Sequence, residues 1–469
     1  MLAIPVAACL SIEDTYADAE SGEMFKLLAD RRGEVTSLVG WLAKQRVCGD
    51  SNPHMDVMPW HEDQLDSHPL WWSKDEVERL LQGQAEIEVM QLRDETARER
   101  RLLRRALLPA VTERVFLKGT ELDAQRLEGL SEELDAALMG AFVSVVSRSF
   151  QQEMDHGAVD VDGTDGDAEE EDQKLSYMHS ARSTLVPILD FAQHRYPASI
   201  TKGLEADLES GVVRMVVRAA SDLSAGEELF YDYGGTRKAD AVFATCYGFA
   251  PNFYSGTTEC PQPTSCVAQV QLLHSLEPEG RAVTQGPDGD ERFHQAKLGK
   301  LRTKWGHRFG ARGRTEATAL TYQISLDQLE KGPCAGGTLD SLLAAARWLA
   351  LTGSDLAEVT QRGEVLDEDA ELEDAARRIL CDGLQLSPTN DMRAAAVVRL
   401  AAQQSKEALQ ASGKHPPEGN LNEGSSEGTA GARPALGKAL YRSEAAVLER
   451  LEDMAEELLQ EAQSLRPFG

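Results

Sequence analysis

The chain has 469 residues, of which 42% are hydrophobic, so it is long enough for two or three globular domains with buried cores. Its 78 acidic residues outnumber 48 lysines and arginines, and a net charge of −30 disfavours both nucleic acids and anionic lipid as partners. A partner protein with a basic segment suits this charge better.

The seven cysteines are scattered and odd in number, which favours reduced thiols over a disulfide framework. Cys260 and Cys266 form the only close pair, and no histidine or second pair stands at the spacing of a zinc site. The sequence therefore predicts no metal. The cysteines are Cys9, Cys48, Cys246, Cys260, Cys266, Cys334 and Cys381.

The apolar stretch 1–10 is short, has no basic flank and runs directly into Glu13 and Asp14, so it is neither a signal peptide nor a membrane span. No other window approaches the length of a transmembrane helix. We expect a soluble, intracellular protein, and the sequence does not distinguish cytoplasm, nucleus and plastid.

Helical patterns dominate the first 150 residues. Residues 24–48 predict two short helices, and a polar loop with prolines covers 50–70. Ser73, followed by acidic residues, predicts an N-cap that opens a long charged helical stretch through Pro109. Residues 122–150 predict another helix, whose expected core stripe is Leu127, Leu130, Leu134, Leu138 and Phe142.

Residues 157–172 consist almost entirely of glycine and acidic side chains, which cannot bury apolar surface. A disordered acidic loop is the preferred interpretation. A calcium-binding loop is the alternative, but the EF-hand order of ligands and its terminal glutamate do not fit.

The pattern changes to β-strands after Thr184. Residues 185–189 form a short apolar run, and 212–217 and 228–233 are typical of strands, separated by Gly211 and the turn at 224–226. This part is expected to be rich in β-structure.

Beyond Phe253 a linker rich in glycine and proline leads to a basic patch at 297–314 and to one expected strand at 319–326. Nucleic-acid binding by the patch is an alternative to a solvated surface, but the overall charge opposes it. Apolar residues at three- and four-residue spacing predict helices through most of 339–468, interrupted by a flexible loop at 412–434.

Four short motifs follow one another in a particular order: SRSF (147–150), LVPILDFAQH (185–194), LSAGEELFYDYG (223–234) and CYGF (246–249). Together they resemble the SET domain of the Rubisco large-subunit and related non-histone methyltransferases. Weaker similarities, at 2–5, 69–83 and 442–448, extend the resemblance over nearly the whole chain.

The resemblance implies an α+β fold with a β-rich SET core, a helical insertion and an all-α C-terminal domain. The SET domain is expected at 1–250, with the insertion at about 73–150 and the acidic loop at 157–172. A linker with the basic patch and a strand follows at 251–335, and a helical substrate-binding domain at 336–469. The implied activity is S-adenosylmethionine-dependent methylation of lysine in a non-histone or histone protein.

Residue roles also follow from the resemblance. Methyl transfer to an amine needs a neutral nucleophile held in a dry channel, so positioning and dipoles matter most. Tyr233 is the implied catalytic group, and Asp190, Tyr247 and Phe249 are implied to line the substrate side, where aromatic faces accommodate a methylammonium.

Arg148 is implied to bind the methionine carboxylate of the cofactor, for which a guanidinium is well shaped, and Gln193 and His194 to hold the cofactor as well. Each residue has a structural interpretation too. Tyr231 and Tyr233 alternate like core and surface residues of a strand, and Arg148 suits a helix C-terminus.

The sequence departs from the family pattern in several places. The chain starts beyond the position of the family's Gly-x-Gly turn, so a shortened or degenerate member is expected. Gln193 replaces an asparagine, and a second asparagine is replaced within 238–241. These changes keep open a catalytically impaired SET-like binding module, and a histidine acceptor is a further alternative because related enzymes use one.

Overall fold

The structure is a computed structural model of the whole chain. It describes residues 2–50, 52–118, 124–151, 183–206, 213–233, 238–251, 266–272, 295–298, 321–333, 338–352, 355–356, 368–380, 384–411 and 432–465. The acidic stretch 157–172, most of the basic patch 297–314, and Cys260, Cys334 and Cys381 lie outside these ranges. The four described cysteines are buried, and no two of them form a disulfide with each other.

A layer of helices forms the N-terminal part of the molecule. The predicted pair at 24–48 is confirmed, since α2 ends at Arg32 and α3 begins at Glu34, with Gly33 between them. Apolar faces of these two helices and of the two long helices at 83–117 and 124–148 enclose one core, which includes Phe25, Leu38 and Phe142. The helices are α1 (Ile12–Tyr16), α2 (Gly22–Arg32), α3 (Glu34–Cys48), α6 (Gly83–Leu117) and α7 (Ala124–Arg148).

The helical stretch expected from Ser73 to Pro109 is divided between two helices. Ser73 does cap a helix, because its Oγ accepts the N–H of Glu76 at 3.1 Å, but α5 (Lys74–Leu80) is short. The backbone is extended at the next residue, and α6 then runs past Pro109. Pro109 is exposed, so water can solvate the carbonyl that its missing N–H leaves without a partner.

Short helices fill the expected polar loop at 50–70. They are α4 (Pro53–Asp56), η2 (Glu62–Gln64) and η3 (Pro69–Trp71). In the predicted α7 stripe, Leu130, Leu134, Leu138 and Phe142 are fully buried, whereas Leu127 is 40% exposed and does not belong to the core.

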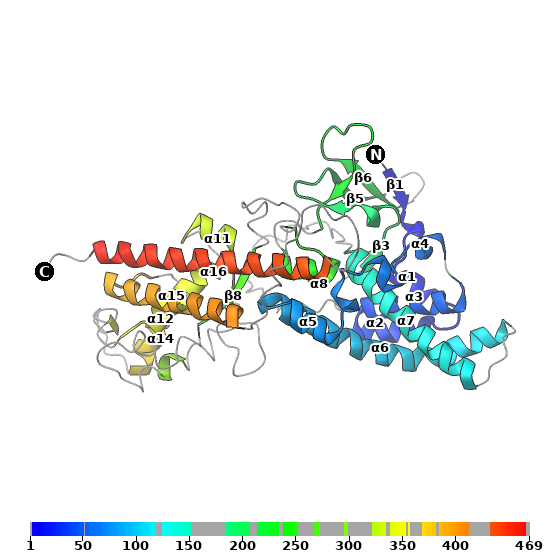
Figure 1. Cartoon of the computed structure of the whole chain (residues 1–469), viewed down its shortest axis with the longest axis horizontal. Helices are drawn as coiled ribbons and strands as arrows, with labels where there is room; N and C mark the ends of the chain where they lie inside the picture. The colour runs from blue at the N-terminus through cyan, green and yellow to red at the C-terminus, as the bar shows by residue number, and fades with distance from the viewer. Residues whose placement is uncertain are drawn as a thin grey trace.

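The β-structure consists of small sheets, so the chain is α+β but the expected β-rich core is not confirmed. The largest sheet has the antiparallel order β1-β6-β5. Its strands are β1 (Leu2–Pro5), β5 (Ile200–Ala206) and β6 (Val213–Ala219), which confirms the strand expected at 212–217. Figure 1 shows this sheet beside the N-terminal helices.

Two further strand pairs bring distant segments together. β2 (Ser149–Gln151), which continues directly from α7, pairs antiparallel with β3 (Ser183–Leu185). β4 (Gln193–His194) pairs parallel with β7 (Phe230–Tyr231), which is shorter than the strand expected at 228–233.

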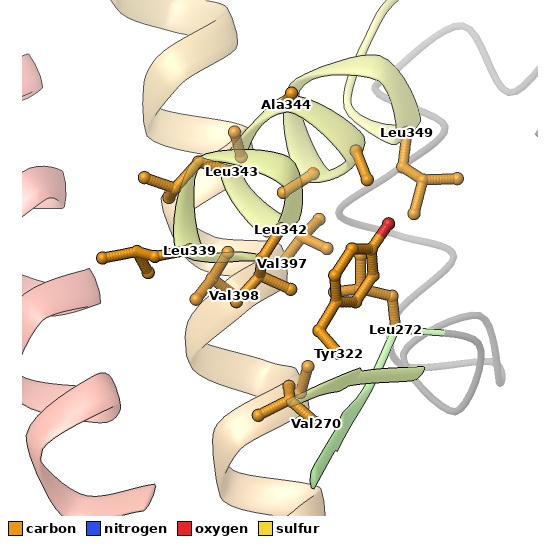
Figure 2. Close-up of a cluster of buried hydrophobic side chains, with 14 of the residues drawn as sticks. Val270, Leu272, Tyr322, Leu339, Leu342, Leu343, Ala344, Leu349, Val397 and Val398 are labelled. Carbon is orange, nitrogen blue, oxygen red and sulfur yellow. The ribbon is translucent and has the colours of Figure 1, made fainter. Parts of the chain in front are cut away.

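The C-terminal part is a separate helical lobe built around one short antiparallel pair of strands. Apolar side chains of the helices meet Val270 and Tyr322 of the two strands in a closed core, as Figure 2 shows. The elements are β8 (Val267–Gln271), β9 (Thr321–Ser325), α11 (Leu326–Lys331), α12 (Thr338–Leu349), α14 (Glu368–Leu380), α15 (Pro388–Ala411) and α16 (Ala432–Ser464). The expected strand near 319–326 and the expected helices are confirmed, although α16 already begins within the loop expected at 412–434.

Helix α16 joins the two parts of the molecule, because its first half also packs against α5, α6 and α8 (Asp240–Tyr247) (Figure 1). Arg433 pairs with Glu62 and, at 2.7 Å, with Glu76. A Cβ at Gly437 would overlap the carbonyl oxygen of Leu80, so only glycine permits this close approach.

Glu444 of α16 is buried at this junction. Its Oε2 accepts the N–H of Gln84, in the first turn of α6, at 3.2 Å, and the backbone of Gln269 in β8 donates a second hydrogen bond. One turn of α16 thus touches three elements, since the Oγ of the neighbouring Ser443 also donates to Asp240 of α8 at 2.6 Å.

Burial raises the pKa of Glu444 from 4.5 to about 7. Between these values the folded chain holds a proton that the unfolded chain releases, so the contribution of Glu444 to stability is fully present below pH 4.5 and is lost as the pH rises to about 7. The loss is on the order of 3 kcal/mol. We expect Glu444→Gln to be more stable than the natural chain at pH 8 and to remove this decline, measured by urea unfolding at pH 5 and pH 8.

The exposed Glu449 of the same helix provides a matched control. Glu449→Gln should leave the difference between pH 5 and pH 8 unchanged. A Glu444→Gln variant with the same pH dependence as the natural chain would contradict the assignment.

In the part of the chain that the structure describes, no helix is long and apolar enough to cross a bilayer.

Candidate functional site

The β4–β7 pair is the scaffold of the candidate site. Gln193 lies opposite Phe230 and His194 opposite Tyr231, and Ser199 holds the pair by accepting the N–H of Phe230 at 2.7 Å. Because the two strands are parallel, the segments on either side of them lie together. The second and third sequence motifs therefore meet at this point.

Tyr233 follows β7 and is fixed at both ends. Its hydroxyl donates to the carbonyl of Ala192 at 2.7 Å, and its N–H donates to Nδ1 of His194 at 3.2 Å. Burial raises the pKa of Tyr233 to about 12, with Arg148 opposing and Asp190 reinforcing the shift. The hydroxyl therefore stays protonated at neutral pH and serves as a hydrogen-bond group.

Aromatic rings surround Tyr233. The ring centroid of Tyr247 lies 4.8 Å from that of Tyr233, and those of His194 and Phe249 lie at 5.4 and 6.1 Å. Phe243 completes the group at 4.7 Å from His194. We call these five residues the aromatic cluster. Its faces present the electron-rich surface that accommodates an alkylammonium cation.

The end of α8 places Tyr247 and Phe249 in the aromatic cluster. Gly248 between them adopts φ = +77°, and a Cβ there would lie 2.9 Å from the backbone of His68. Nε2 of His68 lies 3.0 Å from the carbonyl of Cys246, while its Nδ1 accepts the N–H of Leu70. Burial lowers the pKa of His68 to about 4, so this ring is a neutral, fixed donor.

A buried charge cluster lies beside the rings. Oδ2 of Asp190, in η4 (Leu189–Phe191), lies 3.0 Å from Nε2 of His54 and 3.6 Å from Nη1 of Arg148. The carboxylate is fully buried, and the His54 side chain is 6% exposed. Oδ1 of Asp190 and Nη1 of Arg148 have no hydrogen-bond partner among the described residues. Buried polar atoms without a hydrogen-bond partner are suited to bind a polar ligand.

Lys238 approaches the aromatic cluster from the segment before α8. Its Nζ donates to the carbonyl of Tyr233 at 2.7 Å and to the hydroxyl of Tyr247 at 2.9 Å. The nitrogen lies 5.2 Å from the centre of the Tyr247 ring. Burial lowers the pKa of Lys238.

The structure brings six of the seven predicted site residues into two adjoining groups. Tyr233, His194, Tyr247 and Phe249 belong to the aromatic cluster, and Arg148 and Asp190 form an ion pair. The side chain of Gln193 is exposed and belongs to neither group. Arg148 was expected at the cofactor and Asp190 at the substrate, so their ion pair links the two expected halves of the site.

Sequence reasoning missed His54, Phe243 and the role of Lys238. His54 is 136 residues from Asp190 and follows Asn52 and Pro53, a local pattern that indicates only the start of a helix. Phe243 lies in the sequence between Tyr233 and Tyr247. Its aromatic side chain between two predicted site tyrosines was the signal that could have found it.

The residues present fit the methionine end of S-adenosylmethionine. Arg148 keeps a buried guanidinium nitrogen without a hydrogen bond to a described residue, at the rim of the aromatic cluster, where its charge acts on Tyr233. A carboxylate is the natural partner of that group. Within the described residues, no group of three histidine, cysteine or acidic side chains is placed to hold a metal.

The fold of this chain is similar to that of solved SET-domain structures. The SET domain of LSMT bound to lysine and AdoHcy matches with a TM-score of 0.57 and 15% identity, covering 100% of this chain and 83% of that one. Rubisco LSMT bound to sinefungin and monomethyllysine matches with a TM-score of 0.57, 18% identity, and coverage of 100% and 84%. The chain has the SET-domain fold of Rubisco LSMT.

A third structure, Rubisco LSMT bound to AdoMet, has a TM-score of 0.52 at 18% identity, with the same coverage of 100% and 84%. No family model and no curated protein matches the sequence. At such low identity the SET-domain fold is the shared property. The match spans both the N-terminal part and the C-terminal lobe, since it covers the whole chain.

Proposed function

We propose that the chain is an S-adenosylmethionine-dependent protein-lysine N-methyltransferase. The observation that carries the proposal is the aromatic cluster around a protonated Tyr233, beside the ion pair of Arg148 with the buried Asp190, in a SET-domain fold. The similar structures are of Rubisco LSMT with lysine or methyllysine and with AdoMet or AdoHcy, which supports this chemistry.

The proposed roles follow from the contacts. Arg148 binds the carboxylate of the cofactor. His194 fixes the backbone at Tyr233 by accepting its N–H, and the exposed Gln193 contributes to cofactor binding from the edge of the site. S-adenosylmethionine supplies an electrophilic methyl group. Tyr233 orients the acceptor, Asp190 attracts its ammonium form, and Tyr247 and Phe249 exclude water from the reacting groups.

The helical part of the C-terminal lobe, 336–469, is proposed to bind the protein substrate. Helix α16 supports this assignment because it contacts α8, which ends at Tyr247. A substrate with a basic segment suits the charge of −30. Lysine is the proposed acceptor, and histidine remains the alternative because both present a nitrogen lone pair.

A SET-like binding module is the second candidate, favoured by the direct ion pair between Asp190 and Arg148. In such a module Asp190 would permanently occupy the guanidinium that the cofactor needs. The two functions differ in whether the full chain binds the cofactor.

Titration calorimetry with S-adenosylhomocysteine separates them. We expect binding by the natural chain, weakened about 10- to 100-fold by Arg148→Met because a charged hydrogen bond is lost. Arg195→Met is a matched control, since Arg195 is exposed and lies 4.1 Å over the Phe230 ring. No measurable binding by the natural chain would exclude the enzyme and leave the binding module.

A further inference from the structure

The side-chain amine of Lys238 lies at the aromatic cluster, where methyl transfer would need an acceptor amine. A neutral primary amine has two N–H groups and one lone pair, and Nζ has two oxygen acceptors within 3 Å, the carbonyl of Tyr233 and the hydroxyl of Tyr247. Donating both hydrogens to them leaves the lone pair free. The burial that lowers the pKa of Lys238 also favours this neutral form.

The surroundings of Nζ suit the product as well as the reactant. The nitrogen lies 5.2 Å from the centre of the Tyr247 ring, which in turn packs against Tyr233, Phe243 and Phe249. Aromatic faces stabilise an alkylated ammonium without requiring N–H donors. A methylated Lys238 would keep this contact.

We propose that Lys238 occupies the acceptor position of the site when no protein substrate is bound, and that the chain methylates Lys238 itself. This inference rests on the proposed methyltransferase function and on a sulfonium methyl donor. The lone pair of Nζ forms the new N–C bond, the C–S bond of the donor breaks, and its electron pair stays on sulfur as a thioether. The nitrogen then releases one proton to solvent.

The first experiment uses the full chain with S-adenosylmethionine carrying a labelled methyl group, followed by peptide mapping by mass spectrometry. The expected result is a methyl group on Lys238, at a fractional rate independent of chain concentration because the reaction is intramolecular. Label should disappear from this position in Lys238→Arg and in Tyr247→Phe.

Lys202 offers a matched control, because its Nζ also lies over aromatic rings, 5.4 Å from Phe150 and 5.7 Å from Tyr231. Lys202→Arg should leave the modification of Lys238 intact. An unmodified Lys238 in a chain that binds S-adenosylhomocysteine overturns the self-methylation but not the proposed function. A chain that binds no cofactor overturns both.

A second measurement needs no turnover. If Lys238 occupies the acceptor position, Lys238→Ala should bind free lysine at least about tenfold more tightly than the natural chain, because the internal competitor is gone. Calorimetry with free lysine measures this, with Lys202→Ala as the control. Equal affinities of the natural chain and Lys238→Ala would overturn the placement of Lys238.

Discussion

Replacing Tyr233 with phenylalanine is expected to lower methyl transfer about 100-fold, because a misplacement near 1 Å in a positioned site costs that much. The substitution removes only the hydroxyl, which donates to Ala192 at 2.7 Å and fixes the ring 4.8 Å from Tyr247. Transfer of a labelled methyl group from S-adenosylmethionine to proteins of a cell extract measures the effect.

Tyr231→Phe is the matched control, since Tyr231 lies two residues away and its ring centroid is 6.3 Å from that of Tyr233. This variant should retain most of the transfer rate. Equal losses in both variants would point to a packing defect, and full activity of Tyr233→Phe would remove Tyr233 from the mechanism. Affinity for S-adenosylhomocysteine should be similar in all three chains.

Truncating Trp348 to alanine should cost the C-terminal core about 3–5 kcal/mol, the usual range for deleting a buried aromatic side chain. Trp348 is fully buried in α12, and its Nε1 donates to the carbonyl of Lys297 at 3.1 Å. The change leaves both a cavity and a buried carbonyl without that donor. Loss of helical circular dichroism in urea measures the destabilisation.

Tyr322→Phe is the control in the same core. Tyr322 is 1% exposed, and its hydroxyl has no hydrogen-bond partner among the described residues, although the ring packs against α12 and α15 (Figure 2). Removing a buried polar group in that state should be neutral or stabilising by about 1 kcal/mol. A loss comparable to that of Trp348→Ala would show that the hydroxyl has a partner elsewhere in the chain.

Helices of the C-terminal lobe could be predicted because their apolar residues recur every three or four positions. This spacing places them on the one helix face that packs in the core. The break between α5 and α6 could not. It depends on the fit of α16, where Gly437 meets Leu80 and Glu444 accepts the N–H of Gln84, contacts made across more than 350 residues. Leu127 likewise has the spacing of a core residue, yet its side chain is exposed in the folded chain.

Site residues that belong to a short sequence motif could be predicted, whereas residues that reach the site only through tertiary contacts could not. The short motifs, which follow one another in a fixed order, contain Tyr233, His194, Tyr247 and Phe249. The structure brings these four side chains together in the aromatic cluster. Gln193 stands in the right motif but points to solvent, because side chains alternate along the two-residue strand β4. His54 reaches Asp190 only through the packing of α4, for which the sequence has no local signal.

Helix α16 also limits how the chain can be divided. Its first half belongs to the junction with α5, α6 and α8, and its second half packs with α15 in the C-terminal core. A recombination breakpoint between α8 and β8 would exchange the whole C-terminal lobe together with α16. Such an exchange would separate Gly437, Ser443 and Glu444 from the N-terminal partners that they fit.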